Sequence, residues 1–200
     1  MATATTATTA SRRQGRGGRE RILAAAAGLF AVQGINATGI EQIAERAPVS
    51  KRTLYAHFRT KDELVLAHLE DLSSTGHTLE GTLTREDVPA RERILALFDP
   101  LPAGVDPVRG CPFIDAAVEF PDPRNAVHSY ARERKLLMVR LVAELVAELG
   151  CREPAALAEQ LVTLADGAAS RAMVLDEADY GRHARTAAEI LLANALPTTT

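Results

Sequence analysis

The chain has 200 residues, of which 46% are hydrophobic and 24% charged, and its formal net charge is −3. This apolar content is ordinary for a folded protein and too high for a disordered one. The longest apolar stretch, Leu23–Val32, is far shorter than the roughly 20 residues of a bilayer span, so we expect no membrane helix. Because the N-terminus also lacks a secretory h-region, we expect a cytoplasmic protein whose Cys111 and Cys151 are free thiols.

The charge is unevenly distributed along the chain. Residues 1–60 carry nine Lys and Arg against three Glu, a balance of +6, whereas the other 140 residues carry 14 basic and 23 acidic side chains, a balance of −9. A basic segment attracts phosphate, and an acidic one does not. The asymmetry therefore favours a nucleic-acid-binding N-terminal part.

The N-terminal third reads as a tail followed by short helices. Residues 1–18 hold three glycines and no large apolar side chain after Met1, which predicts a disordered basic tail. Apolar residues at helical spacing predict a helix over 19–32, and Gly34 ends it. Two short helices follow over 40–46 and 51–58, separated by Ala47-Pro48-Val49.

The rest of the chain also shows helical spacing and no sustained alternation of period two. Thr60, with Glu63 three residues on, predicts a capped helix that runs to about residue 74. Residues 76–89 and 99–112 are rich in turn formers. Further helices are predicted over 90–98, 113–120, 124–149, 154–175 and 181–196. The fold class is therefore all-α, with about nine helices.

Residues 36–63 place two short helices across a tight turn, which is the arrangement of a helix-turn-helix. In the second helix Leu54 and Phe58 fall on the inward face, and Lys51 and Arg52 fall outward. Arg and Lys can donate to guanine O6 and N7, so this outward face suits DNA. Ser50 is the expected N-cap, where backbone N–H groups can meet a phosphate.

Residues 19–69 resemble the N-terminal domain of the TetR/AcrR family of transcriptional regulators. The resemblance rests on the run RILAAAAGLFAVQG and on the pattern V-S-x-x-T-L-Y-x-H-F-x-x-K-x-x-L that begins at Val49. It implies a DNA-binding domain at 19–65 and a helical effector-binding and dimerisation domain at 66–200. It also implies a ligand-released homodimeric repressor that binds a palindromic operator in double-stranded DNA through Ser50–Phe58.

The resemblance implies that Lys51 and Arg52 are the base-reading residues and that other residues contact phosphate. The residues it assigns to phosphate are Thr38, Ser50, Thr53, Tyr55, His57 and Lys61. Packing between helices remains an alternative for Tyr55, as does a solvated or capping role for His57. The sequence departs from the family at Pro48, where a glycine is usual. Since proline does not adopt a positive φ, we expect the preceding helix to end without a left-handed residue. Gly39 stands where a Ser or Thr cap is usual, so Thr38 could cap that helix instead.

The C-terminal domain is expected to hold an effector pocket, mostly apolar with a few polar groups. Asp166 interrupts an apolar stretch and, if buried, needs a partner such as Arg171 or the effector. For each candidate an ordinary core or solvated role is the alternative. The candidates are Phe98, Phe113, Ile114, Val118, Phe120, His128, Met138, Asp166 and Met173.

The last two helices have Ala-rich faces, which suit a dimer interface built from two copies of the pair. The sequence holds no nucleophile elbow, zinc-protease, P-loop or dinucleotide-binding pattern, so we expect no catalytic site, metal or cofactor. Two alternatives remain at this point. One is a thiol-sensing regulator that uses Cys111, and the other is a small helical enzyme or adaptor on the same fold.

Overall fold

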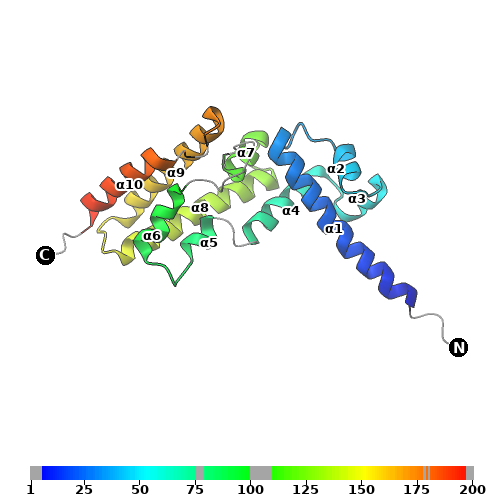
Figure 1. Ribbon diagram of the computed structural model, residues 1–200, viewed down its shortest axis with the longest axis horizontal. Coiled ribbons are helices and arrows are strands. Elements are labelled where there is room, and N and C mark those ends of the chain that lie inside the picture. Colours follow the sequence, from blue (N-terminus) through cyan, green and yellow to red (C-terminus); the bar gives the residue numbers. More distant parts are fainter. Residues whose placement is uncertain (1–5, 75–78, 100–109, 178, 180, 197–200) are drawn as a thin grey trace. The chain divides into compact units, whose positions relative to one another are not determined.

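The computed structural model describes residues 6–74, 79–99, 110–177, 179 and 181–196. Over these residues the protein is all-helical, as predicted, with ten α-helices and one 3₁₀-helix (Figure 1). The chain divides into two compact units, Met1–Glu70 and Asp71–Thr200. No helix in the described part of the chain is both long enough and apolar enough to cross a membrane.

The first unit is built on α1 (Thr6–Gln33), which packs against α2 (Ile40–Arg46) and α3 (Lys51–His57). The chain then enters α4 (Lys61–Ser74), whose first turn is capped as predicted, since the Thr60 hydroxyl accepts from the Glu63 N–H at 3.1 Å. Apolar side chains at helical spacing form the interior of the first unit. They include Ile22, Phe30, Ile43, Leu54, Phe58 and Leu64, all at most 6% exposed.

Helix α1 is longer than the sequence predicts. It begins at Thr6, so residues 6–18 continue the helix where we expected a disordered tail and a helix start near residue 19. The three glycines there each cost about 1 kcal/mol relative to alanine. Against this, a helix that its buried segment has already nucleated gains one hydrogen bond with each added residue. Alanine and arginine are also strong helix formers.

The turn between α2 and α3 contains a left-handed residue after all. Pro48 has φ 23°, so the expectation drawn from proline's usual φ is wrong. The Val49 N–H donates to the Ala44 carbonyl at 3.0 Å, which is the longer hydrogen bond of a Schellman ending. Buried residues on both sides keep the chain in this turn, since Ala47 before Pro48 is 1% exposed and Leu54 after it is fully buried. The tertiary packing of the turn overrides the preference of the proline ring.

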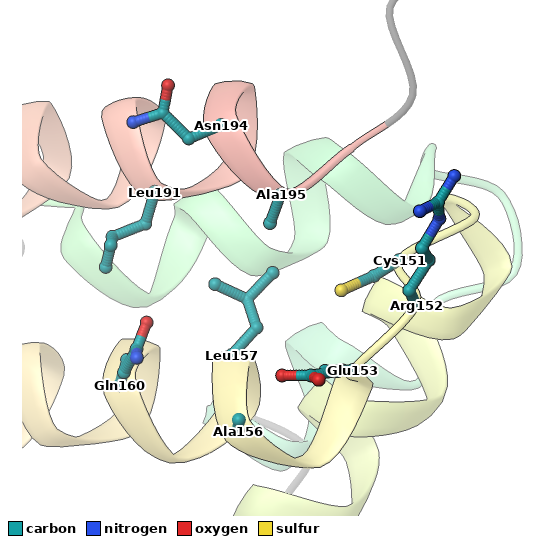
Figure 2. A pocket seen from close by; sticks show the side chains of 9 residues that line it. All are labelled: Cys151, Arg152, Glu153, Ala156, Leu157, Gln160, Leu191, Asn194 and Ala195. Atoms are coloured by element: carbon teal, nitrogen blue, oxygen red, sulfur yellow. The ribbon is translucent and has the colours of Figure 1, made fainter.

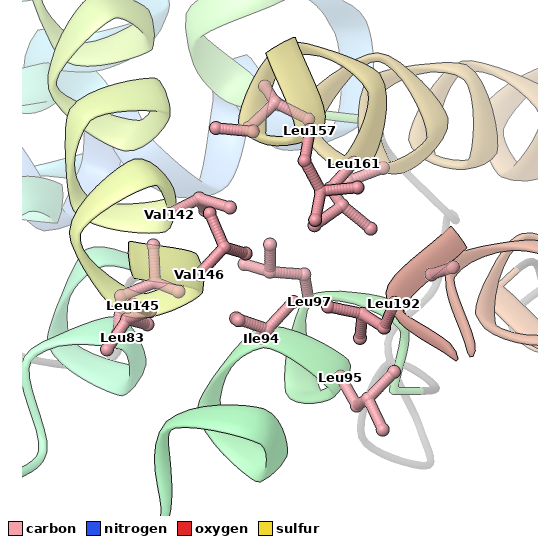
Figure 3. Close-up of a cluster of buried hydrophobic side chains, with 14 of the residues drawn as sticks. Leu83, Ile94, Leu95, Leu97, Val142, Leu145, Val146, Leu157, Leu161 and Leu192 are labelled. Atoms are coloured by element: carbon pink, nitrogen blue, oxygen red, sulfur yellow. The ribbon is translucent and has the colours of Figure 1, made fainter. Parts of the chain in front are cut away.

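In its described residues the second unit has seven helical elements beyond the end of α4. They are α5 (Leu79–Leu83), α6 (Ala90–Leu95), the 3₁₀-helix η1 (Ala96–Phe98), α7 (Pro112–Glu119), α8 (Ala126–Glu148), α9 (Pro154–Leu175) and α10 (Gly181–Ala195). Helix α8 packs on α7 and α9, and α10 packs on α9 (Figure 1). Figure 3 shows the core, where Ile94, Val146 and Leu161 from α6, α8 and α9 meet and are fully buried.

One helix of this unit was not predicted, and the start of another is fixed by a side-chain cap. Helix α5 lies in a stretch that we predicted to be turns. It is held by burial of Leu83 and by an ion pair between Glu80 and Arg134 of α8. The long helix α8 starts at Ala126, where the side chain of Asn125 accepts from the Val127 N–H at 2.8 Å.

Candidate nucleic-acid interface

Helix α3 is fixed on one side and open on the other. The Ser50 hydroxyl accepts from the Thr53 N–H at 3.1 Å and so caps the helix, as predicted. Leu54 and Phe58 are 0% and 3% exposed and anchor the inward face. The other side therefore faces solvent. Its exposed members are Lys51, Arg52, Tyr55 and Ala56.

The two expected base-reading residues differ in their surroundings. Lys51 pairs with Glu41 of α2, and the ammonium holds the pKa of that carboxyl below its usual value, chiefly through the hydrogen bond and then through charge. Both side chains are exposed, so the pair contributes little to stability. The guanidinium of Arg52 has no hydrogen-bond or ion-pair partner among the described residues, which leaves its donors available.

Three further predicted contacts lie at the ends of α3 or beside it. The Thr53 hydroxyl lies 2.9 Å from that of Ser50. His57 is half-buried, and its Nε2 lies 3.0 Å from where a Cβ on Gly18 would be. Lys61 opens α4 and donates to the Asn36 carbonyl at 3.3 Å. Each of the three is thus engaged by a neighbouring residue of the first unit.

Thr38 is not available for a phosphate contact. It is fully buried, its hydroxyl donates to the Gly34 carbonyl at 2.7 Å, and it accepts from Gln33 Nε2 at 3.1 Å. The predicted phosphate contact is therefore replaced by a structural role in the turn between α1 and α2. Thr38 does not cap α2 either. Gly39 is the cap, and its N–H donates to Gln42 Oε1 at 2.7 Å.

Sequence reasoning missed two arginines of α1 that brace the helix-turn-helix. The Arg19 guanidinium lies over the Phe58 ring, 5.4 Å from its centroid. Arg21 Nε donates to the carbonyl of Ala47 at 3.3 Å. The charge count had flagged both residues, but only the fold shows that they support α3 and the turn before it.

The predicted effector residues come together only in part. A groove of about 260 Å³ between α7 and α8 is lined by Phe113, Ile114, Ala117, Val118, His128, Ala131, Arg132 and Lys135. Four of these were predicted. Phe120 lies beside the groove, where its carbonyl is 2.7 Å from His128 Nδ1. Phe98 and Met138 are instead buried in the core of the unit, and Met173 is exposed near the end of α9.

Asp166 has a different partner from the one expected. It pairs with Lys135 of α8 rather than with Arg171, and both side chains of the pair are half-buried. Lys135 also lines the groove between α7 and α8. The ammonium that Lys135 brings to the lining of the groove is therefore already paired with a carboxylate of α9.

The Ala-rich faces of α9 and α10 are divided between the core of the unit and its surface. Part of these faces is buried within the unit itself, namely Leu161, Ala165, Ala168, Ala172 and Ala188. Four residues of these faces that are not buried line a hollow of about 610 Å³, and we call them the α9/α10 strip: Leu164, Ala187, Ile190 and Leu191. A second hollow of about 400 Å³ opens where α9 begins and α10 ends, with Leu157 and Leu191 facing the space between the helices (Figure 2).

Cys111 is a free, half-buried cysteine at the N-cap of α7. Cys151 is also free and half-buried, and it lines the hollow of Figure 2. Among the described residues no three His, Cys, Asp or Glu side chains are grouped to hold a metal ion.

Residues 22–68 match the family described as bacterial regulatory proteins, tetR family. The HTH-type transcriptional regulator YjdC of Escherichia coli is 30% identical over 177 residues, which cover 86% of this chain and 93% of YjdC. The HTH-type transcriptional activator FasR of Mycolicibacterium smegmatis is 39% identical over 85 residues, or 40% of this chain and 39% of FasR. The structure of SCO4454, a TetR-family transcriptional regulator from Streptomyces coelicolor, superposes with a TM-score of 0.77 at 28% identity, covering 90% of this chain and 96% of that one. The chain belongs to the TetR family of DNA-binding transcriptional regulators.

Proposed function

We propose that the protein is a cytoplasmic, homodimeric repressor that binds a two-fold symmetric operator through residues 50–58 and releases it when a small molecule binds the second unit. One observation supports the DNA-reading part most directly. Helix α3 is anchored by Leu54 and Phe58, so its outward face carries Lys51, Arg52 and Tyr55 in fixed positions. An anchored helix with outward basic side chains is suited to the major groove.

The roles divide by position on the helix. Lys51 and Arg52, in its first turn, reach base edges. Ser50, Thr53, Tyr55, His57 and Lys61 surround that turn and contact the phosphates that set the register of the protein on the duplex. The Lys51–Glu41 pair opens on binding, because a surface ion pair is weak beside a line of phosphates.

The α9/α10 strip is the proposed dimer interface. Ile190 is 57% exposed, and Leu164, Ala187 and Leu191 around it are half-buried in the isolated chain. Two copies of a helix pair that meet through such a face form a closed, two-fold symmetric dimer. A dimer of this kind places its two recognition helices about 34 Å apart, one turn of DNA.

The effector site is the groove between α7 and α8. It has the apolar lining and the few polar groups of a small-molecule site, with His128, Arg132 and Lys135 beside Phe113 and Ile114. Release follows only if the effector binds the DNA-free conformation more tightly than the DNA-bound one.

The direction of regulation needs its own measurement, since the relative FasR is named an activator. Transcription from a template that carries the selected site should fall when the protein is added. A rise would make the protein an activator. A thiol-sensing regulator would lose DNA binding under peroxide in the wild type and keep it in Cys111→Ser; an unchanged wild type excludes that alternative.

The first experiment is selection of binding sites from a random duplex library with the full-length protein. We expect a two-fold symmetric consensus with half-sites one DNA turn apart. Arg52→Ala should then lose about 1–3 kcal/mol on that site and discriminate less at one base pair of each half-site. Arg140→Ala, at an exposed position of α8, is the control and should bind as the wild type does. Equal losses on selected and scrambled DNA would make Arg52 a phosphate contact, and enrichment of no site would overturn the proposal.

A further inference from the structure

We propose that the groove between α7 and α8 binds a small organic acid, and that the guanidinium of Arg132 holds the carboxylate of that ligand. This inference rests on the proposed effector site and names the chemical class of its ligand. The ligand is a carboxylate on a short apolar body. Neutral or cationic molecules of the same shape bind the groove more weakly.

The two helices present different chemistry to the groove. On α8, the lining residues His128, Arg132 and Lys135 are spaced at i, i+4 and i+7, which places them on one face of the helix. The lining residues of α7 are all apolar, namely Phe113, Ile114, Ala117 and Val118. The groove therefore has an apolar wall opposite a wall that carries basic groups, and no Asp or Glu is among the described residues that line it.

Arg132 is the basic residue of this lining whose charge is unpaired. Lys135 pairs with Asp166 of α9. His128 is held by its Nδ1, which lies 2.7 Å from the Phe120 carbonyl oxygen; since a carbonyl only accepts, Nε2 is the ring nitrogen left for a ligand. Arg132 is exposed, and its guanidinium has no hydrogen-bond or ion-pair partner among the residues that the structure describes.

An unpaired guanidinium beside an apolar wall is complementary to a carboxylate on an apolar body. Arginine presents a planar fork of N–H donors that can bind both oxygens of a carboxylate. Asp122, just before α8, does not supply that carboxylate, because Arg124 binds it at 3.0 Å. The body of the ligand then lies against Phe113 and Ile114, where burial of its apolar surface adds affinity.

The volume of the groove limits the size of the acid. Its 260 Å³ is small beside the roughly 300–1,000 Å³ of sites for drug-sized ligands. The small side chains of Ala117 and Ala131, one on each helix, border this space. A phenyl ring or a short alkyl chain with one carboxylate fits it, whereas a ligand of several fused rings does not.

The test compares acids with their own amides, which have nearly the same shape and no charge. Benzoate, phenylacetate and hexanoate are each titrated beside the matching amide into the DNA-free, full-length protein, by calorimetry in a buffer without organic acids. We expect at least one acid to bind at one site per chain, about ten- to a hundredfold more tightly than its amide, because its hydrogen bonds to arginine are charge-assisted. The cation phenethylamine should bind no better than the amides. If no acid of the panel binds more tightly than its amide, the inference is wrong.

Three variants locate the site. Arg132→Gln should lower the affinity for the acid to that for the amide and leave the amide unchanged, which a general disturbance of the fold would not do. Arg140→Gln removes a charge from an exposed position of α8 outside the groove and should keep the preference for the acid. Ala117→Leu fills the groove and should weaken both ligands. Equal losses of acid and amide in Arg132→Gln, or unchanged acid binding in Ala117→Leu, would overturn the inference.

Release of DNA is measured separately, by anisotropy of the selected duplex with the tightest acid at saturation. Binding that depends on Arg132 but leaves the DNA bound would support the anion site and contradict release through this groove. Release that persists in Arg132→Gln would support a ligand-released regulator and overturn the anion site.

Discussion

Pro48 combines an unfavourable residue with a turn that the fold requires. Its φ of 23° lies far from the −65° that the pyrrolidine ring prefers. Proline also lacks the N–H that would make the second hydrogen bond of the Schellman ending, to the carbonyl of Glu45. Pro48→Gly removes the ring strain and supplies that donor. It also raises the entropy of the unfolded chain, at a cost of about 0.4–1 kcal/mol.

Because strain at such positions is of order 1–3 kcal/mol, we expect Pro48→Gly to stabilise the first unit by about 1 kcal/mol. Urea unfolding followed by circular dichroism measures the change. Pro48→Ala is the companion variant and should gain less, since alanine is itself strained at a positive φ. A Gly variant less stable than the wild type would show that the proline ring is accommodated without strain.

Two other single residues show where sequence reasoning stops. Thr38 was assigned to phosphate by analogy, but its hydroxyl is committed to Gly34 and it is fully buried. For Asp166 the sequence offered Arg171 or the effector as a partner, whereas the partner is Lys135 on a different helix. A pattern along one element indicates that a buried polar group needs a partner. Which side chain supplies that partner depends on how helices pack.

At the scale of elements, local signals predicted several boundaries and tertiary contacts decided the others. Helix α2 (Ile40–Arg46) and helix α9 (Pro154–Leu175) begin and end where the sequence places them, because Gly39 and Pro154 are local start signals. Helix α5 was missed because five residues among turn formers carry no periodicity. It exists through the burial of Leu83 and the pairing of Glu80 with α8.

The start of α10 depends on a glycine for close approach. A Cβ added at Gly181 would lie 1.8 Å from the carbonyl oxygen of Phe98 in η1, and backbone does not yield as a flexible side chain does. We therefore expect Gly181→Ala to destabilise the second unit by about 1–3 kcal/mol. Thermal unfolding provides the measurement.

Gly167→Ala is the matched control for that substitution. Gly167 lies within α9, where nothing is within 4 Å of the added Cβ, so alanine should stabilise the protein by up to about 1 kcal/mol. If Gly181→Ala lowers the stability of the protein and Gly167→Ala raises it, close packing at Gly181 is the cause of the first effect. If Gly181→Ala were also neutral or stabilising, η1 and α10 would be free to separate at little cost.

At the scale of the whole molecule, the proposed roles of the two parts of the chain follow their net charges. The basic N-terminal 60 residues contain the helix-turn-helix, and the acidic remainder contains the groove and the α9/α10 strip. Sequence alone separated these two parts, because charge and the helix-turn-helix pattern are local properties. It did not separate the strip from the core, since alanines of both occur on the same two helices. Only burial shows that Ala165 and Ala188 face inward, whereas Ile190 faces out.

Ile190→Glu tests whether that strip joins two copies. The side chain is 57% exposed in the isolated chain, so a carboxylate there is solvated in a monomer and buried without a partner in the proposed dimer. We expect sedimentation to show a monomer and circular dichroism to show an unchanged helix content. Because each monomer then holds a single half-site, affinity for the symmetric operator should fall by about 10²–10⁴. Val118→Glu places the same charge at a 73% exposed position on α7 and should leave the dimer intact. If Ile190→Glu remained dimeric, the two copies would have to meet through another face, and the half-site spacing of the selected operator would then be the guide to it.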